Sequence, residues 1–282
     1  MLEDFDEADI GDIALFISSE RLAKFREIAG SERDAIALHQ QVLAVGAALA
    51  PVLAMIEIAM RNTICEHLRT MFGAPGWLQN PPAPFTWHEE ELGLIRNAER
   101  FAQRAQYAKL SSPAKRALDA VAFPDGVPDN ARHETRVKNR QKSIQVTSGQ
   151  VVAQLTMYFW KRLFSDDYET SLWKRSLRQI FPNKRLDRTD VSDRLETIYQ
   201  ARNRVAHHEP IYGDRLDELL RAIDFFCQNF RSRRPSDDTP LGKLLRPHRA
   251  LLAQQVATLA EDLARFRPSP AAPMPSLPSI ES

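Results

Sequence analysis

Residues 202–210, RNRVAHHEP, combine side chains suited to acid–base and phosphate chemistry. His207 and His208 are two of only seven histidines in the chain. Imidazole exchanges protons near neutral pH, so it can serve as a general acid or base. Arginine presents a planar set of donors that fits a phosphate group. The segment is therefore a candidate for proton transfer beside an anionic group.

The same residues also suit the end of a helix. Pro210 disfavours helical geometry at Glu209, so we expect the helix to end within this segment. The unpaired carbonyl groups at that end favour a cation and would stabilise a protonated imidazole. A histidine near a helix C-terminus is an ordinary stabilising feature. The structural and the chemical interpretations are compatible.

Helix geometry limits which of these residues can act together. At about 100° per residue, Arg202 and His207 lie about 140° apart around the helix and do not share a face. Asn203 and His207 are four residues apart and do share one. A site that uses both Arg202 and His207 therefore needs a flexible arginine or a second motif.

A second Arg-Asn pair occurs at Arg61 and Asn62, within IEIAMRNTICEHL, and is followed by His67. Either these residues or a dimer partner could supply the second motif. Glu57 and Arg61 are four residues apart, in the order that favours an ion pair. Burying two charges is costly unless they are well hydrogen-bonded. The pair therefore indicates either a polar network in the core or one wall of a site.

The middle of the chain is basic. Residues 132–188 carry thirteen Lys or Arg and five Asp or Glu, although the whole chain is nearly balanced at 38 to 37. Residues 123–142 have too few apolar side chains to form a core and are expected to be an exposed, basic, mobile loop. A basic loop can bind a phosphate-bearing partner or simply be a solvated surface. The candidate contacts are Arg136, Lys138, Arg140 and Lys142.

Other motifs give no indication of a metal or a cofactor. The chain has no GxGxxG, P-loop, HExxH or GxSxG motif. Cys65 and Cys227 lack metal-ligand spacing and are expected to be free thiols in a reducing compartment. The acidic N-terminus, MLEDFDEADI, has no features of a secretory signal or an organellar presequence. We predict no metal, no cofactor and a cytoplasmic location.

Residues 42–60, VLAVGAALAPVLAMIEIAM, are long enough to cross a bilayer and contain one charge, Glu57. Gly46 and Pro51 interrupt the stretch, and it has no flanking aromatic belt. A core helix surrounded by other helices is also hydrophobic on all sides. The core helix is favoured, and we predict no membrane partner. A membrane span is the alternative.

The chain is predicted to be all-α, because strand-like alternation is scarce. Ser18 and Ser19 suit the start of a short helix that Gly30 ends, and Ser31 suits the start of a long helix that Pro51 should kink. The expected long helices cover about 33–72, 88–109, 190–208, 214–231 and 241–266. Shorter helical stretches are expected in SSPAKRALDAVA, SGQVVAQLTMYFWKRLF and YETSLWKRSLRQIF.

Three blocks of the sequence resemble the Abi-like proteins, bacterial proteins associated with abortive infection of phage that belong to the HEPN superfamily. The resemblance covers roughly residues 16–230, and the blocks occur in the expected order: IEIAMRNTI, FWKRLFSDDYETSLWKRSLRQIFPN and RNRVAHHEPIY. The resemblance implies an all-α, HEPN-type helical bundle with additional helices over residues 1–230. A C-terminal helix at 241–266 would pack on or beside it, followed by a Pro-rich, disordered tail at 267–282.

The resemblance also implies a reaction. Many HEPN proteins are metal-independent endoribonucleases marked by Arg, four to six residues, and His. Arg202 and His207 fit this pattern, as do Arg61 and His67. By resemblance, His207 would be the general base or acid and Arg202 would clamp the phosphate. Asn203 would orient His207 or the phosphate. Secondary roles would fall to His208, Glu209, Arg61, Asn62 and His67.

The implied partners follow from that reaction. HEPN nucleases usually assemble one site from two copies of the motif, so we expect a homodimer that acts on RNA and is restrained by an antitoxin. The implied role is a toxin-type effector in phage defence. The alternative is a non-catalytic HEPN module that binds RNA or a cognate antitoxin.

Overall fold

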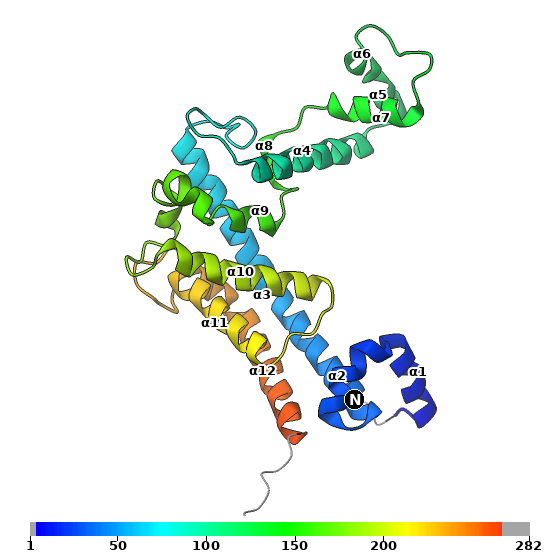
Figure 1. Ribbon diagram of the computed structural model, residues 1–282, viewed down its shortest axis with the longest axis vertical. Coiled ribbons are helices and arrows are strands. Elements are labelled where there is room, and N and C mark those ends of the chain that lie inside the picture. Colours follow the sequence, from blue (N-terminus) through cyan, green and yellow to red (C-terminus); the bar gives the residue numbers. More distant parts are fainter. Residues whose placement is uncertain (1–3, 267–282) are drawn as a thin grey trace, which may run out of the picture. The chain divides into compact units, whose positions relative to one another are not determined.

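The protein is all-α, as the sequence predicts. A computed structural model describes residues 4–266 and contains helices and no strand among them (Figure 1). The expected tail at 267–282 lies outside the described residues. The helices are α1 Glu7–Ile17, α2 Ser19–Ala29, α3 Glu32–Phe72, α4 Glu89–Lys109, α5 Ser112–Ala117, α6 Asp119–Ala122, α7 His133–Lys142, α8 Ser148–Val152, α9 Met157–Arg162, η1 Asp166–Tyr168, η2 Glu169–Trp173, η3 Leu177–Ile180, α10 Arg188–Ala206, α11 Asp214–Asn229 and α12 Pro240–Arg265.

The chain forms two compact units. The first comprises the residues up to 54, residues 201–220 and the residues from 244 onward, and the second comprises residues 55–200 and 221–243. The boundaries fall inside α3, α10, α11 and α12, so each of these helices contributes residues to both units.

The predicted caps define the first helices. The Ser18 hydroxyl accepts a hydrogen bond from the Arg21 N–H at 3.5 Å where α2 begins. Gly30 ends α2 in the left-handed conformation, with φ of 76°, which glycine adopts at little steric cost. Ser31 accepts from the Asp34 N–H at 3.1 Å as α3 starts. From there α3 continues through Pro51 as one helix.

In the first unit, α2 packs through its buried residues Leu22 and Phe25. The Phe25 ring lies 5.6 Å from the His39 ring on α3 and 5.7 Å from the Tyr212 ring after α10. On α3, the Gln41 side-chain amide donates to the Gln255 carbonyl of α12 at 3.1 Å. These contacts hold α2, α3, α12 and the segment after α10 together.

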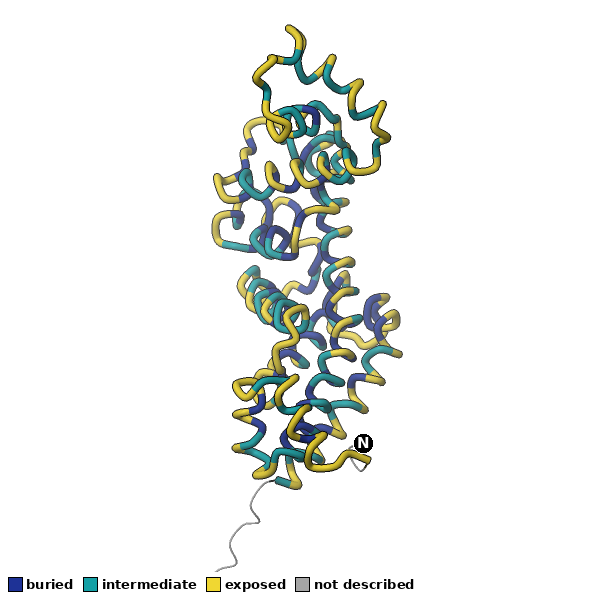
Figure 2. Tube along the Cα trace, turned by 90° about the vertical axis from the view of Figure 1, so that its right-hand side faces the viewer, coloured by how far each residue is buried: buried dark blue, intermediate teal, exposed yellow. Residues whose placement is uncertain are grey.

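The second unit has a core rich in aromatic residues. Figure 2 shows the buried residues of the chain in dark blue. Trp77 and Trp87, which the sequence suggests as packing anchors, are both buried, and the Trp87 indole N–H donates to the Leu78 carbonyl at 2.9 Å. Further buried aromatic residues are Phe85, Phe159, Trp160, Phe164, Tyr168, Trp173, Phe181, Phe226 and Phe230.

The helical stretches expected between 148 and 181 are present, but they are shorter and less regular than the sequence pattern indicates. The segment is divided into α8, α9 and three short 3-10 or π turns, η1, η2 and η3. The buried side chains explain the division, because Leu172 and Trp173 are both buried, as are Ile180 and Phe181. Adjacent residues lie on different faces of a regular helix, so a helix that packs on one side leaves one of the two exposed. A short, irregular turn can bury both.

The prediction of a mobile loop over 123–142 is wrong for its second half, because residues 133–142 form α7. The Arg136 and Arg140 Nε groups donate to Asp119 Oδ1 at 3.1 Å and 2.7 Å, which joins α7 to α6. Hydrogen bonds from Arg140 and then Arg136 hold the pKa of Asp119 well below its usual range. The charges that suggested a loop are therefore partly neutralised by a residue outside the segment.

The second unit also contains a buried carboxylate that the sequence did not reveal. Glu91, in the first turn of α4, is fully buried. Its oxygens accept hydrogen bonds from Arg162 Nε at 2.8 Å and from the Tyr168 hydroxyl at 2.7 Å. Burial and the bond to Glu91 raise the pKa of Tyr168. The three side chains join α4 to α9 and η1.

Among the described helices, α3 alone is long and apolar enough to cross a membrane. A single helix of this kind is weak evidence for a membrane protein, because the core helix of a soluble protein passes the same test. Val45, Leu49 and Val52 of α3 are fully buried in the structure. Only 39% of the most apolar 18-residue window of α3 is buried, so the choice between a core helix and a membrane span stays a prediction.

The Glu91 network predicts a large loss of stability on truncation. Glu91→Ala removes the acceptor of the Tyr168 hydroxyl and one partner of Arg162, which keeps Glu90 and Asp167, so the free energy of unfolding should fall by about 2–3 kcal/mol. Glu89→Ala, two positions earlier and 97% exposed, should cost less than about 1 kcal/mol. Urea unfolding of both variants measures the difference. Equal losses would show that Glu91 does not hold α4 in place.

Candidate functional site

The helix end predicted within RNRVAHHEP is confirmed, since α10 ends at Ala206. The Glu209 N–H donates to the Arg204 carbonyl at 2.8 Å, and the His208 N–H donates to the Val205 carbonyl at 3.2 Å. This pair of bonds is the Schellman motif, which ends many helices. It reverses the chain direction directly after the helix, and both histidines lie in the reversal.

His208 occupies the left-handed position of this motif, with φ of 54°. Glycine is the usual residue there, because a β-carbon clashes with the backbone in this conformation. Arg21 of α2 supports the turn by donating from Nη1 to the His208 carbonyl at 3.1 Å. A strained residue held by its surroundings is a common feature of functional sites.

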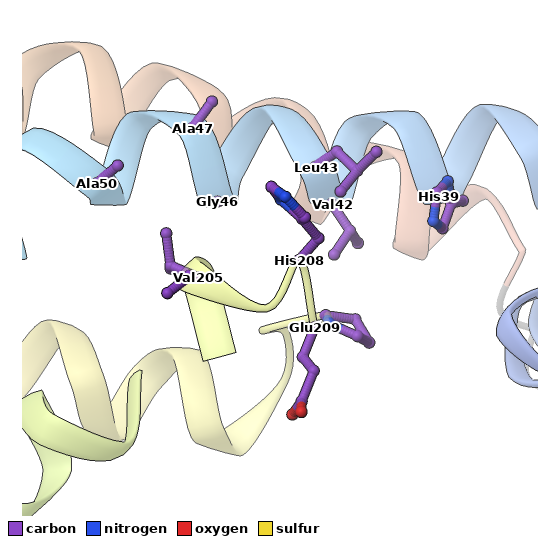
Figure 3. Close-up of a pocket in the computed structure, with 11 residues that line it drawn as sticks. His39, Val42, Leu43, Gly46, Ala47, Ala50, Val205, His208 and Glu209 are labelled. Atoms are coloured by element: carbon purple, nitrogen blue, oxygen red, sulfur yellow. The ribbon is translucent and has the colours of Figure 1, made fainter. Parts of the chain in front are cut away.

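A hollow of about 540 Å³ lies between this turn and α3 (Figure 3). The α3 wall is apolar and includes small residues, so the space remains open. Figure 3 shows the His208 ring directed toward α3, whereas the Glu209 carboxylate points away from it. The lining residues are His39, Val42, Leu43, Gly46, Ala47 and Ala50 from α3, and Val205, Ala206, His208, Glu209 and Pro210 from the turn.

His39 is the buried polar residue of this hollow. It is 8% exposed, and its Nδ1 atom has no hydrogen-bond partner among the described residues. Burial and then the positive charge of Arg21 lower the pKa of His39. The imidazole is therefore neutral near pH 7 and keeps a free capacity for hydrogen bonding.

The structure separates the roles of the two adjacent histidines. Both histidines are exposed, but only His208 lines the hollow. The His207 N–H donates to the Asn203 carbonyl at 3.0 Å, in the last turn of α10. Arg202 and Asn203 are both half-buried on that turn.

Glu209 has a partner that the sequence interpretation missed. Its carboxylate lies 3.0 Å from Arg204 Nη1, and both side chains are partly exposed. An exposed pair of this kind contributes little stability, but it orients the carboxylate away from the hollow. The ion pair could have been predicted from the sequence, because Arg204 lies five residues before Glu209 and Pro210 predicts a helix end between them.

The other Arg-Asn motif lies on α3 in the second unit. Arg61 Nε donates to Asn62 Oδ1 at a long 3.4 Å. Burial and then the positive charge of Arg231 lower the pKa of His67, whose carbonyl accepts from the Ser176 hydroxyl at 3.3 Å. A composite site that joins this motif to a second one stays a prediction.

The four predicted substrate contacts on α7 differ in availability. Arg136 and Arg140 bind Asp119, and Arg140 is almost fully buried. Lys138 and Lys142 are exposed. The sequence revealed the cluster of basic residues but not that Asp119 pairs with two of them.

The left-handed turn predicts an unusual response to substitution. His208→Gly removes the β-carbon clash and should raise the free energy of unfolding by about 1 kcal/mol. His207→Gly is the matched control, because His207 is not in the left-handed region and should gain nothing. Chemical denaturation measures both. A loss of stability in His208→Gly would mean that the ring contacts outweigh the strain.

The described residues contain no group of three or more His, Cys, Asp or Glu placed to hold a metal ion. Cys65 and Cys227 are free thiols, as the sequence predicts. Comparisons of the chain with protein-family models, with curated proteins and with solved structures found no match. The candidate site is therefore defined by its own residues: the turn at 202–210 and the hollow beside it.

Proposed function

We propose that the protein is a metal-independent endoribonuclease whose reaction is carried by the turn at the end of α10. The observation that carries the proposal is the pair of exposed histidines in this turn, of which His208 also lines a hollow, shortly after Arg202 and Asn203. Imidazole and guanidinium groups suffice for RNA cleavage, because the ribose 2′-hydroxyl supplies the nucleophile.

The proposed reaction is an internal transfer. His207 takes the proton of the 2′-hydroxyl, whose oxygen forms a bond to phosphorus while the bond from phosphorus to the 5′-oxygen breaks. A protonated imidazole returns a proton to the leaving 5′-oxygen. Arg202 stabilises the charge on the phosphate oxygens, and Asn203 orients His207 or the phosphate. The products are a 2′,3′-cyclic phosphate and a 5′-hydroxyl.

His208 and the hollow provide a place for the base next to the scissile phosphate. A nucleobase has apolar faces and polar edges, and the hollow has apolar walls with His39 and His208 as polar groups. We infer that one base enters the hollow while its phosphate meets His207. Glu209, paired with Arg204, then acts on the turn rather than on the RNA.

The biological role in this proposal is that of a toxin-type effector in phage defence, which acts in the cytoplasm as a homodimer and is restrained by an antitoxin. A dimer partner, or Arg61, Asn62 and His67, would supply the second motif. The alternative is a HEPN module that binds RNA or an antitoxin without cutting. Loss of cleavage with retained binding would favour that alternative.

Cleavage is tested with purified protein and RNA in the presence of EDTA. The wild type should cut, and His207→Ala and Arg202→Ala should each lower the rate by at least about 100-fold, as expected for loss of a general acid–base or phosphate-binding group. His133→Ala replaces an exposed histidine outside the site and should retain full activity. A strict need for a divalent metal, or activity retained in both site variants, would contradict the proposal.

The hollow is tested by filling it. A side chain at Gly46 meets no atom within 4 Å of its β-carbon, so the helix accommodates a larger residue there. Gly46→Leu should fold normally and cut RNA at least about tenfold more slowly, because the base can no longer enter. Gly46→Ala adds one methyl group and should retain most of the activity. Undiminished cleavage by Gly46→Leu would show that no base binds in the hollow during the reaction.

A further inference from the structure

We propose that a second, basic hollow in the second unit binds the phosphate backbone of single-stranded RNA. The inference rests on the proposed function for its choice of RNA as the polyanion. The hollow has a volume of about 900 Å³ and is formed by two segments some fifty residues apart in sequence. Its lining residues are Pro182, Asn183, Lys184, Arg185, Arg233, Arg234 and Pro235.

Hydrogen bonds fix the two segments against each other. The Arg231 N–H donates to the Ile180 carbonyl at 2.8 Å, with Arg231 in the left-handed region at φ of 55°. The Asn183 side chain is buried and donates to the Asn229 side chain at 3.2 Å. Asn183 also accepts from the Arg185 N–H at 3.1 Å. The walls of the hollow are therefore held before any ligand arrives, which lowers the entropic cost of binding.

All the charged side chains that line this hollow are positive. Lys184, Arg185, Arg233 and Arg234 are all exposed, and no carboxylate belongs to the lining. Within the described part of the chain, none of these four side chains forms an ion pair. Cations that line a concave surface without counterions repel one another and raise the local concentration of anions.

The acidic residues nearest in sequence are engaged elsewhere. Asp187 accepts from the Asp190 N–H at 2.9 Å at the start of α10. Asp237 accepts from the Gln228 side chain at 3.0 Å, and Asp238 lies 4.0 Å from Lys243. These carboxylates keep their negative charge, but among the residues that the structure describes none of them forms an ion pair with a cation of the hollow.

The lining favours a nucleic-acid backbone over other anionic ligands. Arginine forms paired hydrogen bonds to phosphate, and four cations match several successive phosphates better than one small anion. The lining has no aromatic side chain on which a base could stack and no large aliphatic side chain to enter a bilayer. Recognition would thus be of the backbone and independent of sequence. Base recognition would stay with the hollow at the end of α10.

The basic residues of α7, which the sequence predicts as substrate contacts, are the alternative binding site for the RNA backbone. Arg136 and Arg140 share Asp119, so two of the four cations expected from sequence are held in ion pairs and one of their two positive charges is offset. Lys138 and Lys142 are exposed on α7 but line neither hollow. Two pairs of exposed cations can therefore be compared at equal change in net charge: Arg185 with Arg234, and Lys138 with Lys142.

The experiment measures binding of a fluorescent RNA oligonucleotide whose riboses all carry 2′-O-methyl groups, so it cannot be cut. Fluorescence anisotropy is recorded between 50 and 300 mM KCl for the wild type, Arg185→Ala/Arg234→Ala and Lys138→Ala/Lys142→Ala. Each lost phosphate contact should reduce the slope of log K against log salt by about 0.7. The first double variant should bind about 20-fold more weakly at 0.1 M salt, and the second should bind within about threefold of the wild type.

Several results would overturn the inference. They are equal losses in the two double variants, no loss in Arg185→Ala/Arg234→Ala, no binding by the wild type, or tighter binding to vesicles rich in phosphatidylglycerol than to the oligonucleotide. Circular dichroism confirms the fold of both variants. The outcome is separate from the nuclease proposal, because binding of an uncleavable RNA does not require the reaction at His207.

Discussion

The candidate site depends on one backbone constraint, the left-handed conformation of His208 at the end of α10. Pro210 prevents the helix from continuing, and the Schellman bonds from His208 and Glu209 close its last turn. With φ of 54° at His208, the chain turns back and directs this imidazole toward α3 while His207 remains exposed. Glycine would be less strained at this position, and we propose that the histidine is retained there for its side chain.

The basic side chains of the molecule fall into two groups, those held in ion pairs and those without one. Asp119 occupies Arg136 and Arg140, and Glu91 occupies Arg162, so these cations serve the fold. The cations at 184–185 and 233–234 have no such partner among the described residues and line a hollow. We therefore propose that the turn after α10 carries the chemistry and that the second basic hollow binds the RNA backbone.

The helices with clear caps could be predicted from sequence, and so could the helix end in RNRVAHHEP. Ser18, Gly30 and Pro210 act through local backbone geometry, which a sequence displays directly. The helix at 133–142 could not be predicted in this way, because its arginines are satisfied by Asp119, more than fifteen residues away. The irregular turns between 157 and 181 follow from burial on several sides, a tertiary property. The two hollows were missed for the same reason, since each is formed by segments distant in sequence.

The chemistry of the RNA ends tests the central claim most directly. RNA cut by the purified wild-type protein in EDTA should carry 2′,3′-cyclic phosphate and 5′-hydroxyl ends, because the 2′-hydroxyl is the nucleophile. These ends are identified by mass spectrometry of the fragments. Fragments with 3′-hydroxyl and 5′-phosphate ends would show that water is the nucleophile and would contradict the mechanism, and intact RNA would contradict the nuclease itself.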